Sequence, residues 1–188
     1  MLLLVSTAYA AVQVFQLRDE NGNVSYQARQ GNEQEITQLQ KPDTEMVQQQ
    51  MSTQDDLAAF SIEVEGFATI PEKLTDSFVF TKGDIFYEGT ERKKEKIKTA
   101  NAFYQGDSGK IILIIKKADP QEIVYAMPAT MEKIAIDKKE GVYKEIKSST
   151  GNELKQLTWV NGDMLYSLQS ADVNVTKSTL IHIAEKLE

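Results

Sequence analysis

The sequence has 188 residues, of which 41% are hydrophobic, so the chain can bury a real core and its length favours one domain. Its 28 acidic and 21 basic residues give a net charge of −7, which disfavours binding to nucleic acid. The absence of cysteine excludes disulfide bonds, thiolate nucleophiles and thiolate zinc sites.

The first residues, Met1 to Val14, form an uncharged apolar run that favours an extracytoplasmic protein. Ala8-Tyr9-Ala10 has the small-x-small form of a signal-peptidase site. No Lys or Arg precedes the run, and the run is shorter than the ~20 residues that span a bilayer. Three interpretations stay open: a signal peptide with a mis-assigned start, the outer part of a truncated membrane helix, and a buried first element of a cytosolic domain. We expect the first or the second, with this segment as the contact with the membrane.

Residues 15–59 are predicted to hold a β-hairpin and a connector. Two alternating runs flank Asp19-Glu20-Asn21-Gly22-Asn23, and an Asn-Gly pair between such runs is a strong hairpin signal. From Gln27 to Gln54 the chain is rich in glutamine and poor in large apolar residues, which predicts an exposed connector. In its second half, Asp43 or Thr44 could cap a helix whose thin apolar stripe includes Met51.

Residues 60–188 are predicted to form the main domain, with an antiparallel meander of short strands. The predicted strands are Ser77–Thr81, Asp84–Glu88, Thr99–Gln105, Lys110–Lys117, Glu122–Met127, Met131–Ile136, Val142–Lys147, Glu153–Val160 and Met164–Leu168. The predicted turns are Lys82–Asp84, Gly106–Gly109, Lys138–Gly141 and Asn161–Asp163. The run from Ile111 to Ile115 is continuously apolar, which predicts a strand buried on both faces at the centre of the sheet.

The last predicted element is a helix. Thr176 is a suitable N-cap, and Leu180, Ile183, Ala184 and Leu187 recur at helical spacing. The fold class that follows is α+β, a curved antiparallel β-sheet with a C-terminal helix packed on one face.

Catalytic and metal-binding signals are weak throughout the sequence. The single histidine, His182, points away from the apolar stripe of the last helix and is expected to face solvent. The oxygen-rich residues from Asp19 to Asn23 superficially resemble the start of a calcium loop, but a hairpin turn explains them and no glutamate closes a twelve-residue loop. We therefore expect no enzyme, no catalytic residue, no metal site and no cofactor.

Aromatic residues are the candidates for a ligand site. Trp159, Tyr166 and Phe103 lie on predicted strands and could border a groove between sheet and helix. Aromatic residues on alternating strands are more often core residues or cross-strand pairs, so this assignment competes with a structural one.

The C-terminal residues resemble a known family. The stretch from Leu157 to Leu168 has a Trp-containing strand, a Gly turn and a Tyr-containing strand, and Leu180 to Leu187 follows as a helix. Together with Ile134 to Tyr143 and Ile70-Pro71-Glu72, this pattern is similar to the domain-of-unknown-function family 4367 over about Phe60 to Glu188. The resemblance implies an extracytoplasmic domain of Gram-positive bacteria, often found behind a membrane helix in proteins similar to anti-sigma factors or sporulation proteins, and it carries over no catalytic residue.

These observations favour a non-enzymatic extracytoplasmic sensing or binding domain, such as the ectodomain of a membrane-anchored regulator. Its partner would be a protein or a small apolar ligand, and not a nucleic acid. The alternative is a secreted lipid or lipoprotein carrier with an apolar groove between sheet and helix.

Overall fold

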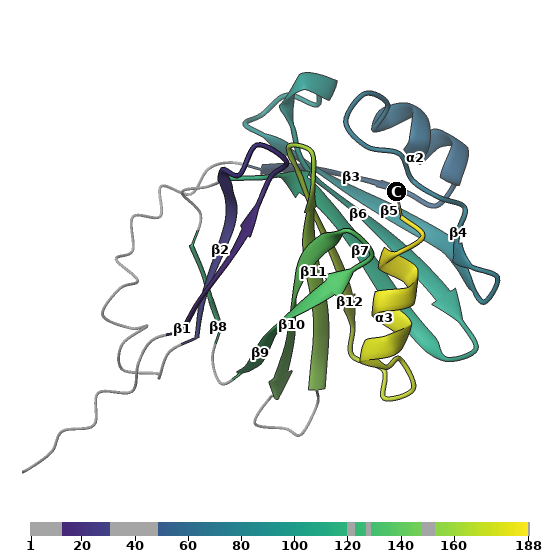
Figure 1. The fold of residues 1–188 in the computed structure, drawn as a ribbon. Helices are drawn as coiled ribbons and strands as arrows, with labels where there is room; N and C mark the ends of the chain where they lie inside the picture. Colours follow the sequence, from purple (N-terminus) through teal and green to yellow (C-terminus); the bar gives the residue numbers. More distant parts are fainter. Residues whose placement is uncertain (1–12, 31–48, 120–122, 127–128, 148–152, 188) are drawn as a thin grey trace, which may run out of the picture.

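A computed structural model describes residues 13–30, 49–119, 123–126, 129–147 and 153–187 (Figure 1). The strands are β1 (Gln13–Arg18), β2 (Val24–Gln30), β3 (Gln49–Gln54), β4 (Lys73–Thr75), β5 (Phe78–Glu88), β6 (Ile97–Gly106), β7 (Gly109–Lys117), β8 (Ile123–Ala126), β9 (Ala129–Ile136), β10 (Lys139–Lys147), β11 (Glu153–Asn161) and β12 (Met164–Ser170). The helices are α2 (Leu57–Glu63), α3 (Lys177–Ala184) and a 3-10 turn at Lys94–Lys96. The chain is an α+β protein with a curved, mostly antiparallel sheet, as the sequence predicts.

The large sheet has nine strands in the order β3-β5-β6-β7-β12-β11-β10-β9, and β4 pairs with β5. It consists of two meanders, β5 to β7 and β9 to β12, which β7 and β12 join by antiparallel pairing. The apolar strand β7 therefore lies inside the sheet, as predicted, but the prediction that both of its faces are buried is wrong. Ile111, Leu113 and Ile115 are buried on one face, whereas Ile112 and Ile114 are only partly covered on the other.

The small sheet has the order β1-β2-β8. β1 and β2 form the hairpin predicted around Asp19–Asn23, where the Asp19 carboxylate accepts hydrogen bonds from the backbone N–H groups of Asn21 and Asn23, at 2.9 and 2.8 Å. β8 was expected inside the antiparallel meander, and this prediction is wrong: β8 pairs parallel with β2. Short-range turn signals cannot reveal this pairing, because about a hundred residues separate the two strands along the chain.

Helices α2 and α3 lie on one side of the large sheet and the small sheet lies on the other (Figure 1). Thr176 caps α3 as predicted: its Oγ1 accepts a hydrogen bond from the Thr179 N–H at 3.1 Å. Leu180, Ile183 and Ala184 are buried against the sheet. We call this face of the large sheet the helix face.

On the opposite face, the small sheet packs on the β9–β12 half of the large sheet. A second apolar cluster joins Leu17, Tyr26 and Ala28 of the hairpin to four large-sheet residues, which are Met131, Val142, Val160 and Leu165. The hairpin is therefore part of the packed structure and not a detached arm.

The turn predicted at Lys82–Asp84 is wrong, because β5 runs unbroken from Phe78 to Glu88. Gly83 lies inside this strand, where a Cβ atom would come 2.4 Å from the ring of Phe60 in α2. The glycine thus marks a close approach of helix to sheet and not a turn. The turn predicted at Lys138–Gly141 is shifted to Asp137 and Lys138, and Gly141 lies within β10. The turns at Gly106–Gly109 and Asn161–Asp163 are confirmed.

The helix predicted in the second half of the connector is also wrong where the structure describes it. Gln49–Gln54 is strand β3, which pairs with β5 at the edge of the large sheet. Glu63 accepts hydrogen bonds from Ser52 Oγ and Gln54 Nε2, at 3.3 and 2.8 Å. Edge pairing satisfies the backbone of this polar segment without an apolar stripe. The proposed caps Asp43 and Thr44 lie outside the described residues, as does the run from Met1 to Ala11.

No helix in the described part of the chain is both long and apolar enough to cross a bilayer.

Candidate functional site

Trp159 and Tyr166 lie together on the helix face. The two rings stack, with centroids 5.5 Å apart and an interplanar angle of 23°. Trp159 is 0% exposed and belongs to the main core with Leu168 and Leu180. In this position the tryptophan acts as a filler of the core beneath α3, because its ring has no exposed surface to offer a ligand.

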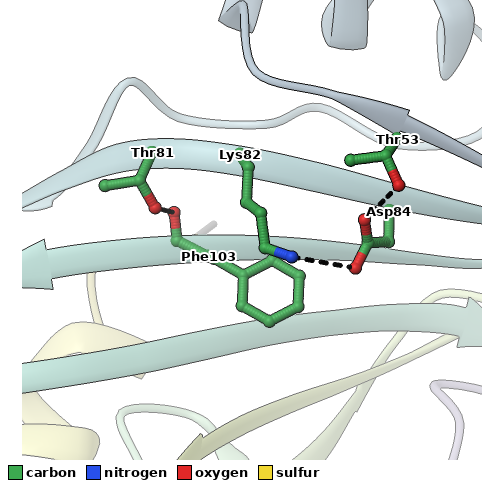
Figure 2. Close-up of polar contacts among 5 residues, drawn as sticks. All are labelled: Thr53, Thr81, Lys82, Asp84 and Phe103. Carbon is green, nitrogen blue, oxygen red and sulfur yellow. Dashed lines mark hydrogen bonds and ion pairs between the residues drawn. The ribbon is translucent and has the colours of Figure 1, made fainter.

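Phe103 lies on the opposite face, so the structure does not bring the three aromatic candidates together. The Lys82 ammonium group lies 4.4 Å from the centre of the Phe103 ring and 3.6 Å from the Asp84 carboxylate (Figure 2). Thr53 Oγ1 donates a hydrogen bond to the same carboxylate at 2.8 Å, and Thr81 Oγ1 donates one to the Phe103 carbonyl at 3.0 Å. These contacts join β3, β5 and β6 and leave Phe103 half-buried under a lysine.

His182 lies on the exposed side of α3, as predicted, with Nδ1 3.9 Å from the Glu185 carboxylate. Among the described residues, no group of three or more histidine and acidic side chains is placed to hold a metal ion.

The strongest candidate site is a groove of about 370 Å³ between the two sheets, which we call the inter-sheet groove. Its floor is the face of the large sheet opposite the helices, and one wall is Tyr26 of β2. The described lining residues are Tyr26, Phe86, Lys98, Thr99, Asn101, Ile114, Lys116, Lys144, Gln156, Leu165, Ser167 and Gln169. Six strands of the large sheet, from β5 to β10 across the sheet, each contribute at least one of them.

The pairing register arranges the floor of the groove in rows. Ile114 of β7 lies opposite Asn101 on one side and Ser167 on the other. In the next row Lys144, Gln156 and Gln169 are neighbours on β10, β11 and β12. Directly paired side chains on one face lie about 5 Å apart at Cβ, so the apolar Ile114 forms the centre of the floor and polar groups surround it.

Lys144 is the most unusual residue of the groove. Its side chain is buried, with 7% of the residue exposed. Burial, followed by the positive charge of Lys116, lowers the pKa of Lys144 below the ordinary lysine value. None of the ion pairs found between described residues includes Lys144. A buried ammonium group without an ion pair destabilises the fold, and lysines with such lowered pKa values are typical of functional sites.

Asn101 is a second polar residue of the groove, and its side chain is not fully hydrogen-bonded to the described residues. Its side-chain oxygen is buried and has no hydrogen-bond partner among the described residues. By contrast, the hydroxyl groups of Thr158 and Ser167 pair with each other at 2.8 Å. A buried carbonyl oxygen without a donor costs free energy, so a donor from solvent or from a ligand would stabilise it.

Sequence reasoning missed this groove because it followed aromatic residues. The available signal was the alternation of polar and buried apolar residues, as in Lys98-Thr99-Ala100-Asn101-Ala102 of β6, where Ala100 and Ala102 are buried on the helix face. Such alternation indicates a half-exposed face but not which strands meet there.

Comparison with known proteins gives a family but no described function. A family model named "Domain of unknown function (DUF4367)" matches residues 71–187. No curated protein and no solved structure matches the chain significantly. All large-sheet residues of the groove fall within the matched segment, whereas Tyr26 precedes it.

Proposed function

The chain belongs to the DUF4367 family, and we propose that it is a non-enzymatic extracytoplasmic sensing or binding domain whose ligand site is the inter-sheet groove. The observation that carries the proposal is the buried Lys144 side chain in a groove of small-molecule size. A chain that needed only stability would gain by an apolar residue at this position.

The groove is suited to coupling a ligand to the rest of the chain. It lies where the hairpin, close to the amino terminus, meets the floor formed by the large sheet. A ligand that contacts both Tyr26 and the large sheet would favour the docked arrangement of the two sheets. Binding would thereby shift the equilibrium between this docked arrangement and any other arrangement of the two sheets.

The non-enzymatic part of the proposal rests on the chemistry of the lining. The titratable side chains among its described lining residues are lysines and one tyrosine, and that set includes no histidine or carboxylate. General acid–base catalysis usually uses a group whose pKa lies near neutrality and a partner that orients it. The inter-sheet groove is better equipped to hold a ligand than to transform one.

The alternative function, a lipid carrier with an apolar groove between sheet and helix, has less support. The described residues beneath α3 form a close-packed core in which Trp159, Leu168 and Leu180 are each 0% exposed. An acyl chain could enter there only if α3 moved away from the sheet. Mass spectrometry of the natively purified protein tests this alternative, because a carrier would retain stoichiometric lipid.

Binding at the groove is tested by NMR of the uniformly ¹⁵N-labelled full chain. The probes are N-acetylphenylalanine as an anion, N-acetylphenylalanine amide as a neutral analogue and phenethylamine as a cation. The proposal expects at least one probe to shift the amide signals of Ile114, Gln156 and Gln169. It is overturned if none of the three shifts them at roughly 10 mM, a concentration that detects millimolar affinities.

A matched pair of variants assigns the shifts to the groove. Gln169→Trp fills the floor of the groove, whereas Gln105→Trp makes the same replacement at an exposed position outside it. The first variant should remove the response to the probes and the second should keep it. An unchanged response in Gln169→Trp would place binding elsewhere.

The extracytoplasmic location is supported by the apolar Met1–Val14 run and is tested separately. We expect the native protein in the membrane fraction or in the culture medium of its host. Amino-terminal sequencing and intact mass distinguish a cleaved chain that begins at Ala11 from a longer anchored chain. An intact chain in the cytosol, beginning at Met1, would contradict the location.

A further inference from the structure

The charge of the inter-sheet groove is opposite to that of the whole protein. The chain has a net charge of −7, yet the described lining residues include Lys98, Lys116 and Lys144 and no aspartate or glutamate. A concave site lined by one sign of charge concentrates the field and attracts ligands of the opposite sign. A lining of this charge favours an anionic ligand over a cationic one.

The three lysines differ in their exposure to solvent. Lys98 is exposed, Lys116 is half-buried and Lys144 is buried. The ammonium group of Lys144 has lost most of its contact with water and is repelled by Lys116. An anionic group next to Lys144 would offset both effects, and a charge-assisted hydrogen bond in such a place is stronger than one at the surface.

The remaining lining residues indicate which other groups a complementary ligand would carry. Phe86 and Ile114 offer apolar surface beside the lysines. The Asn101 oxygen, which has no hydrogen-bond partner among the described residues, could accept a hydrogen bond from an N–H or O–H group of a ligand. Inorganic anions would leave both features unused. The complementary molecule carries a charged group, a neighbouring apolar group and a hydrogen-bond donor.

From these features we infer that the inter-sheet groove binds a small organic anion, whose carboxylate or phosphate contacts Lys144 and whose apolar part covers Ile114. This inference rests on the proposed function and adds the chemical class of the ligand. The carboxylate and phosphate alternatives share the same contacts and are separated by experiment.

Titration of the full chain with four probes, followed by NMR and calorimetry, tests the inference. N-acetylphenylalanine supplies a carboxylate, an N–H group and a ring, and its amide is the uncharged analogue. Phenyl phosphate supplies the phosphate, and phenethylamine is the cation. The carboxylate or the phosphate should bind at least about tenfold more tightly than the amide, and its affinity should fall as the salt concentration rises.

Variants of equal charge change identify the lysine responsible. Lys144→Gln should weaken binding of the anion at least about tenfold and leave the affinity for the amide unchanged. Lys186→Gln removes the same charge from an exposed position after α3 and should change neither affinity. If both variants weaken the anion equally, binding reflects overall charge and the inference is overturned.

The outcomes separate this inference from the proposed function. If the amide or the amine shifts the groove signals as strongly as the anions do, the groove remains a binding site but the inference of an anion is overturned. If no probe shifts those signals, both are overturned. If phenyl phosphate binds tightly and N-acetylphenylalanine weakly, or the reverse, the result supports the inference and shows which anionic group the groove prefers.

Discussion

Lys144 and Lys116 extend from β10 and β7 into the same groove, and after burial it is the charge of Lys116 that lowers the pKa of Lys144. Two strands, β11 and β12, separate them in the sheet. The charge of Lys116 adds to the cost of burying a charged Lys144, and an anionic group beside Lys144 would offset that cost. This relationship is the physical basis of the proposed site.

The first prediction concerns stability. Replacing Lys144 with Met keeps most of the apolar stem and removes the buried ammonium group, so the free energy of unfolding should rise by about 1 kcal/mol. Urea denaturation at neutral pH measures the change. Lys186→Met, at an exposed site, should change the free energy by less than about 0.5 kcal/mol. A marked loss of stability in Lys144→Met would show that the lysine is a structural residue and not a functional one.

A second prediction addresses the close approach of α2 to the sheet. Gly83→Ala places a Cβ atom 2.4 Å from the Phe60 ring, so the ring or the helix that carries it must shift, at a cost of about 2 kcal/mol. The double variant Gly83→Ala/Phe60→Leu should lose less stability than the sum of the two single variants, because the smaller side chain relieves the contact. Additive losses in this double-mutant cycle would contradict the assigned contact.

Trp159 and Phe103 provide a third prediction, because sequence reasoning grouped residues that the structure places on opposite faces. Trp159→Ala should destabilise the fold by about 3–5 kcal/mol, as expected for a large aromatic residue removed from a core. Phe103→Ala, at a half-buried ring, should cost clearly less. Thermal and urea unfolding measure both, and equal losses would be inconsistent with their different burial.

The fourth prediction is a pH dependence that involves Glu63. Burial raises the pKa of Glu63, but hydrogen bonds from Tyr87, Gln54 and Ser52, together with the positive charge of Arg92, outweigh burial and hold the pKa below its ordinary value of 4.5. The folded pKa is therefore below the unfolded one. The stabilisation is present above pH 4.5 and is lost as the pH falls through the folded pKa.

Unfolding by urea at pH values from 7 to 3 measures this dependence. Glu63→Gln should be less stable than the wild type at neutral pH, and the difference should shrink as the pH falls. Tyr87→Phe should behave in the same way, since it removes a donor to the same carboxylate. A difference that does not change with pH would contradict the role assigned to the ionised Glu63.

Much of the fold follows from local sequence signals. The Asn-Gly pair specifies the first hairpin, Thr176 with its capping box specifies the start of α3, and the run Ile111–Ile115 specifies an inner strand. Each depends on neighbouring residues alone. The family resemblance drawn from the C-terminal strands and helix is confirmed over residues 71–187.

The errors concern contacts between distant segments. Gly83 suggested a turn, because nothing local reveals that Phe60 lies against it. The parallel pairing of β8 with β2 and the joining of β7 to β12 are likewise decided by tertiary packing. The inter-sheet groove was unpredictable for the same reason, since each of six strands supplies a few side chains that meet only in the folded sheet.

The most direct test of the central claim is the pKa of Lys144 in the full chain, measured by NMR of its ε-methylene group without and with saturating N-acetylphenylalanine or phenyl phosphate. The signal can be assigned by its loss in Lys144→Met. We expect a pKa below 10.5 in the free protein and an increase when the anion binds, because a nearby negative charge favours the protonated lysine. A pKa of 10.5 in the free protein, or one that the bound anion leaves unchanged, would contradict an anion site at Lys144.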